Sequence, residues 1–324
     1  MEKFFLILEI LIFIMQFKIV WKGFKMINKK KLLKPKIDVV FHSLFRVGNE
    51  DITKAIITAI TRDNIETVDM NNDRHIIGKY AEEKLGILDL KVTLDNGTIC
   101  DIEIQLADNK DTAERFLYYW SRVYSGQLVK GDDYKKLNKV IGIIILDYKF
   151  EKIKEIESIH SKWKIKETLS GKEIELTDTF ELHIIEIPKA RRILEREPKN
   201  EIAQWMMFLN NPNEEEVFRI VKENKEIKRA MKELEEISEN EELRRIAELR
   251  EKAIRDEKNA LRHAIESGFE QGIEEGIKQG MEQGIEVRNI EIVKKLIQRG
   301  EKIENIIEIT GLTKEKILEI KEQK

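Results

Sequence analysis

The stretch GILDLKVTLDNGTICDIEIQ, residues 86–105, decides the predicted fold. Apolar and polar residues alternate through residues 86–94 and again through residues 98–106, as they do in strands with one buried face. The tripeptide Asp-Asn-Gly at residues 95–97 lies between them and is a strong signal for a hairpin turn. The sequence therefore predicts two paired antiparallel strands.

The register of this hairpin follows from the positions of its apolar residues. Both apolar faces are buried together only if Leu94 pairs with Thr98. That pairing leaves a three-residue loop in which Gly97 takes the left-handed conformation of a bulged turn. It also places Asp89 directly opposite Glu103, whereas a two-residue loop would mix the faces.

Two carboxylates that face each other have β-carbons about 5 Å apart, and a divalent cation relieves their repulsion. Oxygen ligands that leave room for water suit Mg²⁺, and also Mn²⁺. Asp89 and Glu103 are therefore the predicted metal ligands, and Gln105 on the same face is predicted to orient the attacking water. The alternative is an ordinary half-exposed hairpin, with Lys91 and Asp101 as a surface pair.

The segments around the hairpin indicate the fold class. Helices are predicted at residues 51–61 and 112–129, and strands at residues 140–146 (VIGIIIL) and 180–187. The continuous apolar strand is typical of a sheet covered on both faces. The sequence therefore predicts an α/β domain with a mixed sheet flanked by helices.

Composition restricts the class of protein. The chain has 324 residues, of which 41% are hydrophobic and 37% charged, with a formal net charge of −3, so a DNA-binding surface must be local. The single cysteine, Cys100, excludes a disulfide framework and favours a reducing, cytoplasmic setting. The five histidines lack metal-ligand spacing, and no small-molecule cofactor is expected.

Residues 1–25 are predicted to be an over-extended gene start, because Met26 opens an ordinary cytoplasmic amino terminus. The apolar run at residues 4–17 makes a membrane anchor the alternative. That run is shorter than the ~20 residues of a membrane-spanning helix and contains Glu9. Membrane association is therefore not expected.

Residues 86–105 resemble the central motif of the recombination-promoting nuclease/transposase family, a bacterial branch of the PD-(D/E)XK nuclease superfamily. That motif is an Asp on one strand and Glu-x-Gln on the next, here Asp89, Glu103 and Gln105. The stretch KPKIDVVFHSLF, residues 34–45, resembles the family's opening motif, with His42 where lysine is more usual. The following helix, turn and core strand agree as well, and the similarity covers about residues 34–188.

The resemblance implies a restriction-endonuclease-like fold and a magnesium-dependent endonuclease that hydrolyses DNA phosphodiesters and is linked to recombination. Asp89, Glu103 and Gln105 would form its catalytic core. Gln105 replaces the superfamily's usual lysine, so the alternative is a catalytically weak or inactive DNA-binding or scaffolding protein that keeps the fold. On the next helix, Arg115 is a candidate contact to DNA phosphate with Tyr119 beside it. The alternative is a solvent-facing arginine and core-filling aromatic residues, and for the aromatic residues core filling is favoured.

The predicted nuclease domain spans residues 26–190, and a charged helical region follows at residues 191–286. Glycine recurs there at every fourth position from Gly268 to Gly284, so the stripe advances about 40° per step around a helix. Five interior glycines cost about 5 kcal/mol against alanine. A homo-oligomer with closely packed helices and a pliable spacer both fit this pattern, and the homo-oligomer is favoured.

Residues 287–324 have the outline of a helix-turn-helix unit. Its last helix mixes lysine with glutamate and lacks arginine or asparagine, the residues that most often read bases. A small helical packing module is therefore favoured over a DNA-reading element.

Overall fold

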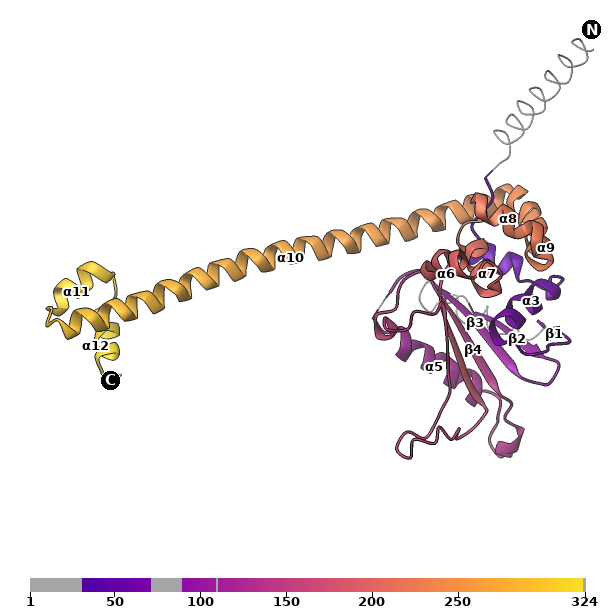
Figure 1. Cartoon of the computed structure of the whole chain (residues 1–324), viewed down its shortest axis with the longest axis horizontal. Coiled ribbons are helices and arrows are strands. Elements are labelled where there is room, and N and C mark those ends of the chain that lie inside the picture. Colours follow the sequence, from indigo (N-terminus) through magenta and orange to yellow (C-terminus); the bar gives the residue numbers. More distant parts are fainter. Residues whose placement is uncertain (1–30, 71–88, 109, 323–324) are drawn as a thin grey trace, which may run out of the picture. The chain divides into compact units, whose positions relative to one another are not determined.

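The computed structural model describes residues 31–70, 89–108 and 110–322. The chain divides into two compact units, Met1–Ile254 and Arg255–Lys324, whose elements are labelled in Figure 1. Residues 1–25, predicted to be an over-extended start or an anchor, lie outside the described residues. None of the described helices combines the length and the apolar composition that a membrane crossing requires.

The strands are β1 (Val68–Asp69), β2 (Asp89–Leu94), β3 (Ile99–Gln105), β4 (Val140–Leu146), β5 (His160–Trp163) and β6 (Phe180–Glu186). The α-helices of the first unit are α2 (Asp38–Leu44), α3 (Glu50–Thr61), α5 (Thr112–Ser125), α6 (Ala190–Arg196), α7 (Glu201–Asn210), α8 (Glu215–Glu223) and α9 (Lys225–Glu239). Helix α10 (Glu241–Gln298) begins in the first unit and continues in the second, which also contains α11 (Ile303–Thr310) and α12 (Lys314–Glu322).

Within the described residues, six strands form one sheet in the order β1-β2-β3-β4-β6-β5. Strands β3, β4 and β6 are parallel, while β2 and β5 run antiparallel to their neighbours. The predicted mixed sheet is therefore confirmed. The predicted hairpin register is confirmed as well, because Asp89 pairs with Glu103, Leu94 N–H donates to Thr98 O at 2.8 Å, and Gly97 has φ +81°.

Different helices cover the two faces of the sheet. One face carries Ile143 and packs into a large core with Ile57 of α3 and Trp205 of α7. The other face carries Ile144 and packs against Phe116 of α5. Figure 1 shows α5 on one side of the strands and α3 and α7 on the other. This arrangement explains why the VIGIIIL strand is apolar on both faces.

A glycine in β4 sets the distance between α5 and the sheet. A β-carbon added at Gly142 would lie 2.1 Å from Cζ of Phe116, far inside van der Waals contact. The Phe116 ring therefore occupies the space that any larger residue at position 142 would need. This close approach holds α5 directly against β3 and β4.

Several element boundaries test the sequence predictions. The helix at residues 51–61 and the strand at residues 140–146 are confirmed. The predicted end of α5 at residue 129 is wrong, since the helix ends at Ser125. The side chain of Gln127 hydrogen-bonds the backbone N–H and C=O of Asn138, which holds the chain in a turn instead of a further helical turn. Helix α2 and the strands β1 and β5 were not predicted.

The second unit has a small core of its own. The carboxyl-terminal part of α10 packs on α11 and α12 through Val293, Ile306, Ile317 and Ile320. Gly311 ends α11 in the left-handed conformation with φ +67°, and the Thr313 hydroxyl accepts a hydrogen bond from Lys316 N–H in the first turn of α12. These helices occur where the sequence outline predicts them.

Candidate active site

The polar side chains of β3 are buried on the face of the sheet that α5 covers. Asp101, Glu103 and Gln105 are 6%, 3% and 8% exposed. The alternative interpretation, in which these three side chains of a half-exposed hairpin face solvent, is therefore wrong. Polar-apolar alternation shows that residues share a face, but it does not show whether another layer of the protein covers that face.

Strand pairing brings the two predicted metal ligands to the same height on neighbouring strands. The backbone of Asp89 lies directly opposite Glu103, and the side chain of Asp89 is outside the described part of the structure. Residues that face each other on antiparallel strands have β-carbons about 4.5–5.5 Å apart. Glu103 itself lies on the central strand β3, between β2 and β4.

Gln105 is held at both ends of its amide. Its Nε2 donates to Oε1 of Glu103 at 2.8 Å. Its Oε1 lies 3.2 Å from the Tyr148 hydroxyl and 3.4 Å from the Thr112 hydroxyl. The two hydroxyls lie 2.7 Å apart, so when one of them donates its single proton to the other, the second hydroxyl donates to Gln105. Because the acceptor end faces two hydroxyls, the donor end faces Glu103, and the network orients that carboxylate.

Glu103 is a buried carboxylate, and nearby hydrogen-bond donors and positive charge offset only part of the cost of burying its negative charge. Burial raises its pKa, while the hydrogen bond from Gln105 and the charge of Arg115 act in the opposite direction. The Nη2 atom of Arg115 lies 3.5 Å from Oε1 of Glu103. A carboxyl group with a raised pKa gains from any further positive charge that approaches it.

The structure brings Arg115 to the site and places Tyr119 beside it. The guanidinium carbon of Arg115 lies 5.8 Å from the centre of the Tyr119 ring, close enough for a cation–π contact. The alternative interpretation, that the tyrosines of this helix fill the core, fails for Tyr118, which is 56% exposed.

Sequence reasoning missed Thr112 and Tyr148. Tyr148 follows the carboxyl end of β4 by two residues. In α/β sheets, ligands bind outside the carboxyl ends of the parallel strands, so its position was a usable signal. Thr112 is the first residue of α5, and nothing in the sequence indicates that it faces Gln105. Burial raises the pKa of Tyr148 to about 12, so its hydroxyl stays protonated at neutral pH.

The donor set fits a small hard cation. Among the described side chains, no group of three or more His, Cys, Asp and Glu gathers as a metal site. Two carboxylates on facing strands supply oxygen ligands only and leave positions for water, the arrangement that Mg²⁺ and Mn²⁺ accept. The raised pKa of Glu103 is consistent with a carboxylate that lacks a full complement of positive charge.

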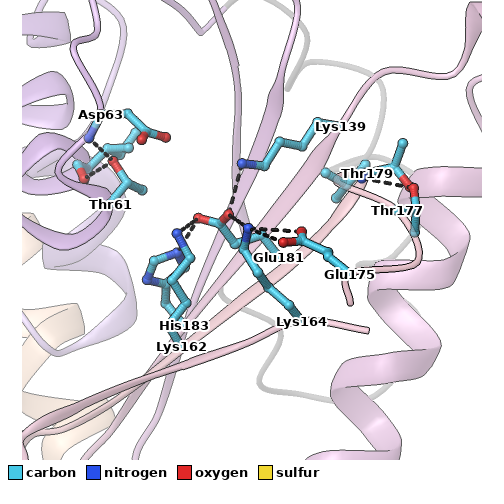
Figure 2. Close-up of polar contacts among 12 residues, drawn as sticks. Thr61, Asp63, Lys139, Lys162, Lys164, Glu175, Thr177, Thr179, Glu181 and His183 are labelled. Atoms are coloured by element: carbon cyan, nitrogen blue, oxygen red, sulfur yellow. Dashed lines mark hydrogen bonds and ion pairs between the residues drawn. The ribbon is translucent and has the colours of Figure 1, made fainter. Parts of the chain in front are cut away.

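A second polar cluster lies on the opposite face of the sheet. Glu181 is 1% exposed and accepts hydrogen bonds from Lys139 at 2.9 Å and from His183 at 2.8 Å, and it pairs with Lys162 at 2.8 Å. Figure 2 shows these side chains converging on the Glu181 carboxylate, with Lys164 beside it. Burial alone would raise the pKa of Glu181, but the hydrogen bonds outweigh it and hold the pKa well below its ordinary value.

The sheet also joins two histidines that are 23 residues apart in the sequence. His160 Nε2 lies 2.7 Å from His183 Nδ1, and the rings stack with centroids 4.9 Å apart. Burial is the main cause that lowers the pKa of His160 to about 4. With Glu181 paired and both imidazoles hydrogen-bonded, this cluster joins β5 and β6 to each other and, through Lys139, to the residue that precedes β4.

Comparison with known proteins agrees with this geometry. The sequence model of the family described as PD-(D/E)XK nuclease family transposase matches residues 35–264, which include the whole sheet and every site residue named above. No curated protein and no solved structure gives a significant match. The mixed sheet with flanking helices is the restriction-endonuclease-like fold that the motif resemblance implied. With more than half of its length matched, this chain belongs to the PD-(D/E)XK nuclease family transposases.

Proposed function

We propose that this protein is a metal-dependent endonuclease that hydrolyses DNA phosphodiesters in recombination. One observation carries the proposal. In a chain of this nuclease family, the buried carboxylate of Glu103 lies in backbone register with Asp89. A protein gains no stability from two facing acidic positions on neighbouring strands, but such positions suit a cation and its phosphate ligand.

Asp89 and Glu103 are the residues that would hold Mg²⁺ or Mn²⁺. When bound, the ion would supply a water of lowered pKa and a Lewis acid for the scissile phosphate. Glu103 must be ionised to act as a ligand. The hydrogen bond from Gln105 and the charge of Arg115 favour that ionised state against the effect of burial.

Gln105 acts in this proposal as a positioning residue. Its Nε2 is engaged by Glu103 and its Oε1 by Tyr148 and Thr112, so the amide keeps one carboxylate oxygen in a fixed direction. The contribution to catalysis is orientation, because a neutral amide adds no charge to the transition state.

Arg115 supplies the positive charge that glutamine lacks. It is the cation beside Glu103, and Tyr119 lies next to its guanidinium. A guanidinium binds phosphate through two parallel hydrogen bonds. We therefore assign to Arg115 and Tyr119 the contact with the DNA phosphate.

Gln105 also motivates the second candidate function, a DNA-binding or scaffolding protein that keeps the nuclease fold with little or no catalysis. The two candidates differ in one observable property. The scaffold binds DNA and leaves it intact in every metal, whereas the nuclease cuts it in Mg²⁺ or Mn²⁺.

The test is cleavage of supercoiled plasmid in Mg²⁺, Mn²⁺ or Ca²⁺ by the wild type and the variants Asp89→Asn and Glu103→Gln. The matched control is Glu114→Gln, which removes a carboxylate beside Arg115 that is 65% exposed and pairs with Lys152. We expect cleavage in Mg²⁺ or Mn²⁺ that falls at least 100-fold in the two site variants and persists in the control.

Either of two other results would change the assignment. Equal cleavage by all four proteins would place the active site elsewhere. DNA binding by the wild type without cleavage in any metal would favour the scaffold.

The proposal extends to partners and location. DNA is the proposed substrate, and a second copy of the chain is the proposed protein partner, through the C-terminal helices. A cytoplasmic location is proposed because the one cysteine, Cys100, is a buried free thiol.

A further inference from the structure

Helix α10 contains a four-residue repeat that extends beyond its glycines. Residues 260–287 read ALRH AIES GFEQ GIEE GIKQ GMEQ GIEV. The first position of every tetrad is glycine or alanine, the second is a large apolar residue, and the third is charged without exception. All 28 residues lie within the continuous helix Glu241–Gln298, in a segment about 42 Å long at 1.5 Å per residue.

The repeat divides the circumference of the helix into two kinds of surface. Successive residues are about 100° apart, so the small and the apolar positions of a tetrad form one face. The charged third position is about 150° from the middle of that face. The chain thus keeps charge away from this face. On it, the small first positions form a shallow groove, the glycine groove, and the large second positions form a ridge beside it, the apolar ridge.

This face has no neighbour within the described residues. The apolar residues of the repeat are between 48% exposed, at Ile273, and 70% exposed, at Phe269. A β-carbon added at any glycine from Gly268 to Gly284 would have no atom within 4 Å. A contiguous apolar surface that runs along the whole repeat and is exposed to solvent marks an interaction site.

The pitch of the face favours a second copy of this chain as its occupant. Four residues span 400°, so the face advances about 40° per tetrad in the right-handed sense. Rows of residues spaced four apart fit the grooves between such rows on another helix when the two axes cross at about −50°. A helix with the same four-residue period can follow the turning face through all its tetrads, and a second copy of this chain offers that period.

The available area is sufficient for a stable pair. Burying the apolar side chains of the repeat removes roughly 100 Å² each, on the order of 700 Å² per chain. A standard protein interface buries about 800 Å² per partner. The small first positions allow the two backbones to approach closely, which adds contact area between them.

We infer that residues 260–287 bind the same residues of a second chain in a right-handed helix pair, with the apolar ridge of each helix in the glycine groove of the other. The inference names the surface through which the proposed self-association occurs. It does not depend on nuclease activity, because the contact involves neither DNA nor metal.

Sedimentation equilibrium of the full-length chain, without DNA or metal, tests it. The decisive variant is Gly276→Leu, which fills the groove, and its matched control is Glu274→Leu, which adds the same side chain on the charged side. We expect twice the mass of one chain for the wild type and the control, and the mass of one chain for Gly276→Leu. Leucine favours helix over glycine, so the helical circular dichroism of Gly276→Leu should be undiminished when the pair is lost.

Ionic strength provides a second readout. Association through an apolar face strengthens or holds as salt rises, whereas binding through surface charge weakens. A wild-type chain of single mass at all concentrations would overturn the inference. Unchanged pairing of Gly276→Leu would overturn it too, and so would pairing that 0.5 M salt abolishes.

Discussion

Replacing Glu103 with glutamine should stabilise the metal-free protein while it removes the metal site. Burial raises the pKa of Glu103 above its ordinary value of 4.5. A carboxyl group whose pKa is raised in the folded state makes its full contribution to the free energy of unfolding at pH values below its pKa in the unfolded chain. That contribution is lost as the pH rises through its pKa in the folded protein. At neutral pH the carboxylate is therefore a net cost to folding, and a neutral amide of the same shape avoids that cost.

The size of the effect follows from the contacts. Burying an ionised carboxylate costs several kcal/mol, and a hydrogen bond to a charged group returns about 1.5–3 kcal/mol. Gln105 supplies one such bond at 2.8 Å, while Arg115 at 3.5 Å is at the outer limit. The compensation is incomplete, so we expect Glu103→Gln to raise the free energy of unfolding on the order of 1 kcal/mol. The corresponding rise in Tm is about 2–4 °C.

Thermal unfolding in EDTA and in Mn²⁺ measures both parts of the prediction. A metal at ten times its Kd adds about 1.4 kcal/mol to the wild type and nothing to Glu103→Gln. The matched control is Glu181→Gln, which removes an equally buried glutamate whose hydrogen bonds lower its pKa. Breaking that cluster costs about 3–5 kcal/mol, and the metal response should be unchanged.

The critical result is that the same Glu→Gln substitution changes the Tm in opposite directions at these two buried positions, up at Glu103 and down at Glu181. If Glu103→Gln lowered the Tm in EDTA, the argument from incomplete compensation would be refuted. If Mn²⁺ stabilised Glu103→Gln as much as the wild type, Glu103 would not be a metal ligand.

Three further predictions concern residues around the two polar clusters. Because the pKa of His160 is lowered to about 4, its contribution to stability is present above about pH 6.5 and is lost as the pH falls toward 4. A His160→Gln variant should therefore show a flatter dependence of Tm on pH over that range. Gly142→Ala should cost about 1–3 kcal/mol, because its new methyl group meets Phe116 at 2.1 Å; a urea titration should show part of this loss restored by Phe116→Leu in the same chain. Tyr148→Phe should lower kcat roughly 3- to 10-fold and raise the Mn²⁺ concentration needed for half-maximal cleavage, since Gln105 loses one of the hydroxyls that orient it. An unchanged metal titration would contradict the positioning role of Tyr148.

Local pattern determined the part of the fold that carries the proposed chemistry. The hairpin register could be read from sequence because strands alternate with a period of two and because a three-residue loop needs a left-handed residue, here Gly97. Pairing Asp89 with Glu103 followed from these short-range constraints alone. The strand at residues 140–146 was equally readable, since a continuous apolar run has no solvent face.

Tertiary structure alone decided what covers that hairpin and which distant residues complete its site. Alternation places Glu103 and Gln105 on one face, but it is the packing of α5, with the Phe116 ring against Gly142, that buries that face. Tyr148 reaches Gln105 because β4 pairs in parallel with β3. Such contacts join segments tens of residues apart, and their formation depends on how whole layers pack. A periodic sequence records which side chains share a face, while the identity of the opposing layer is a property of the folded chain.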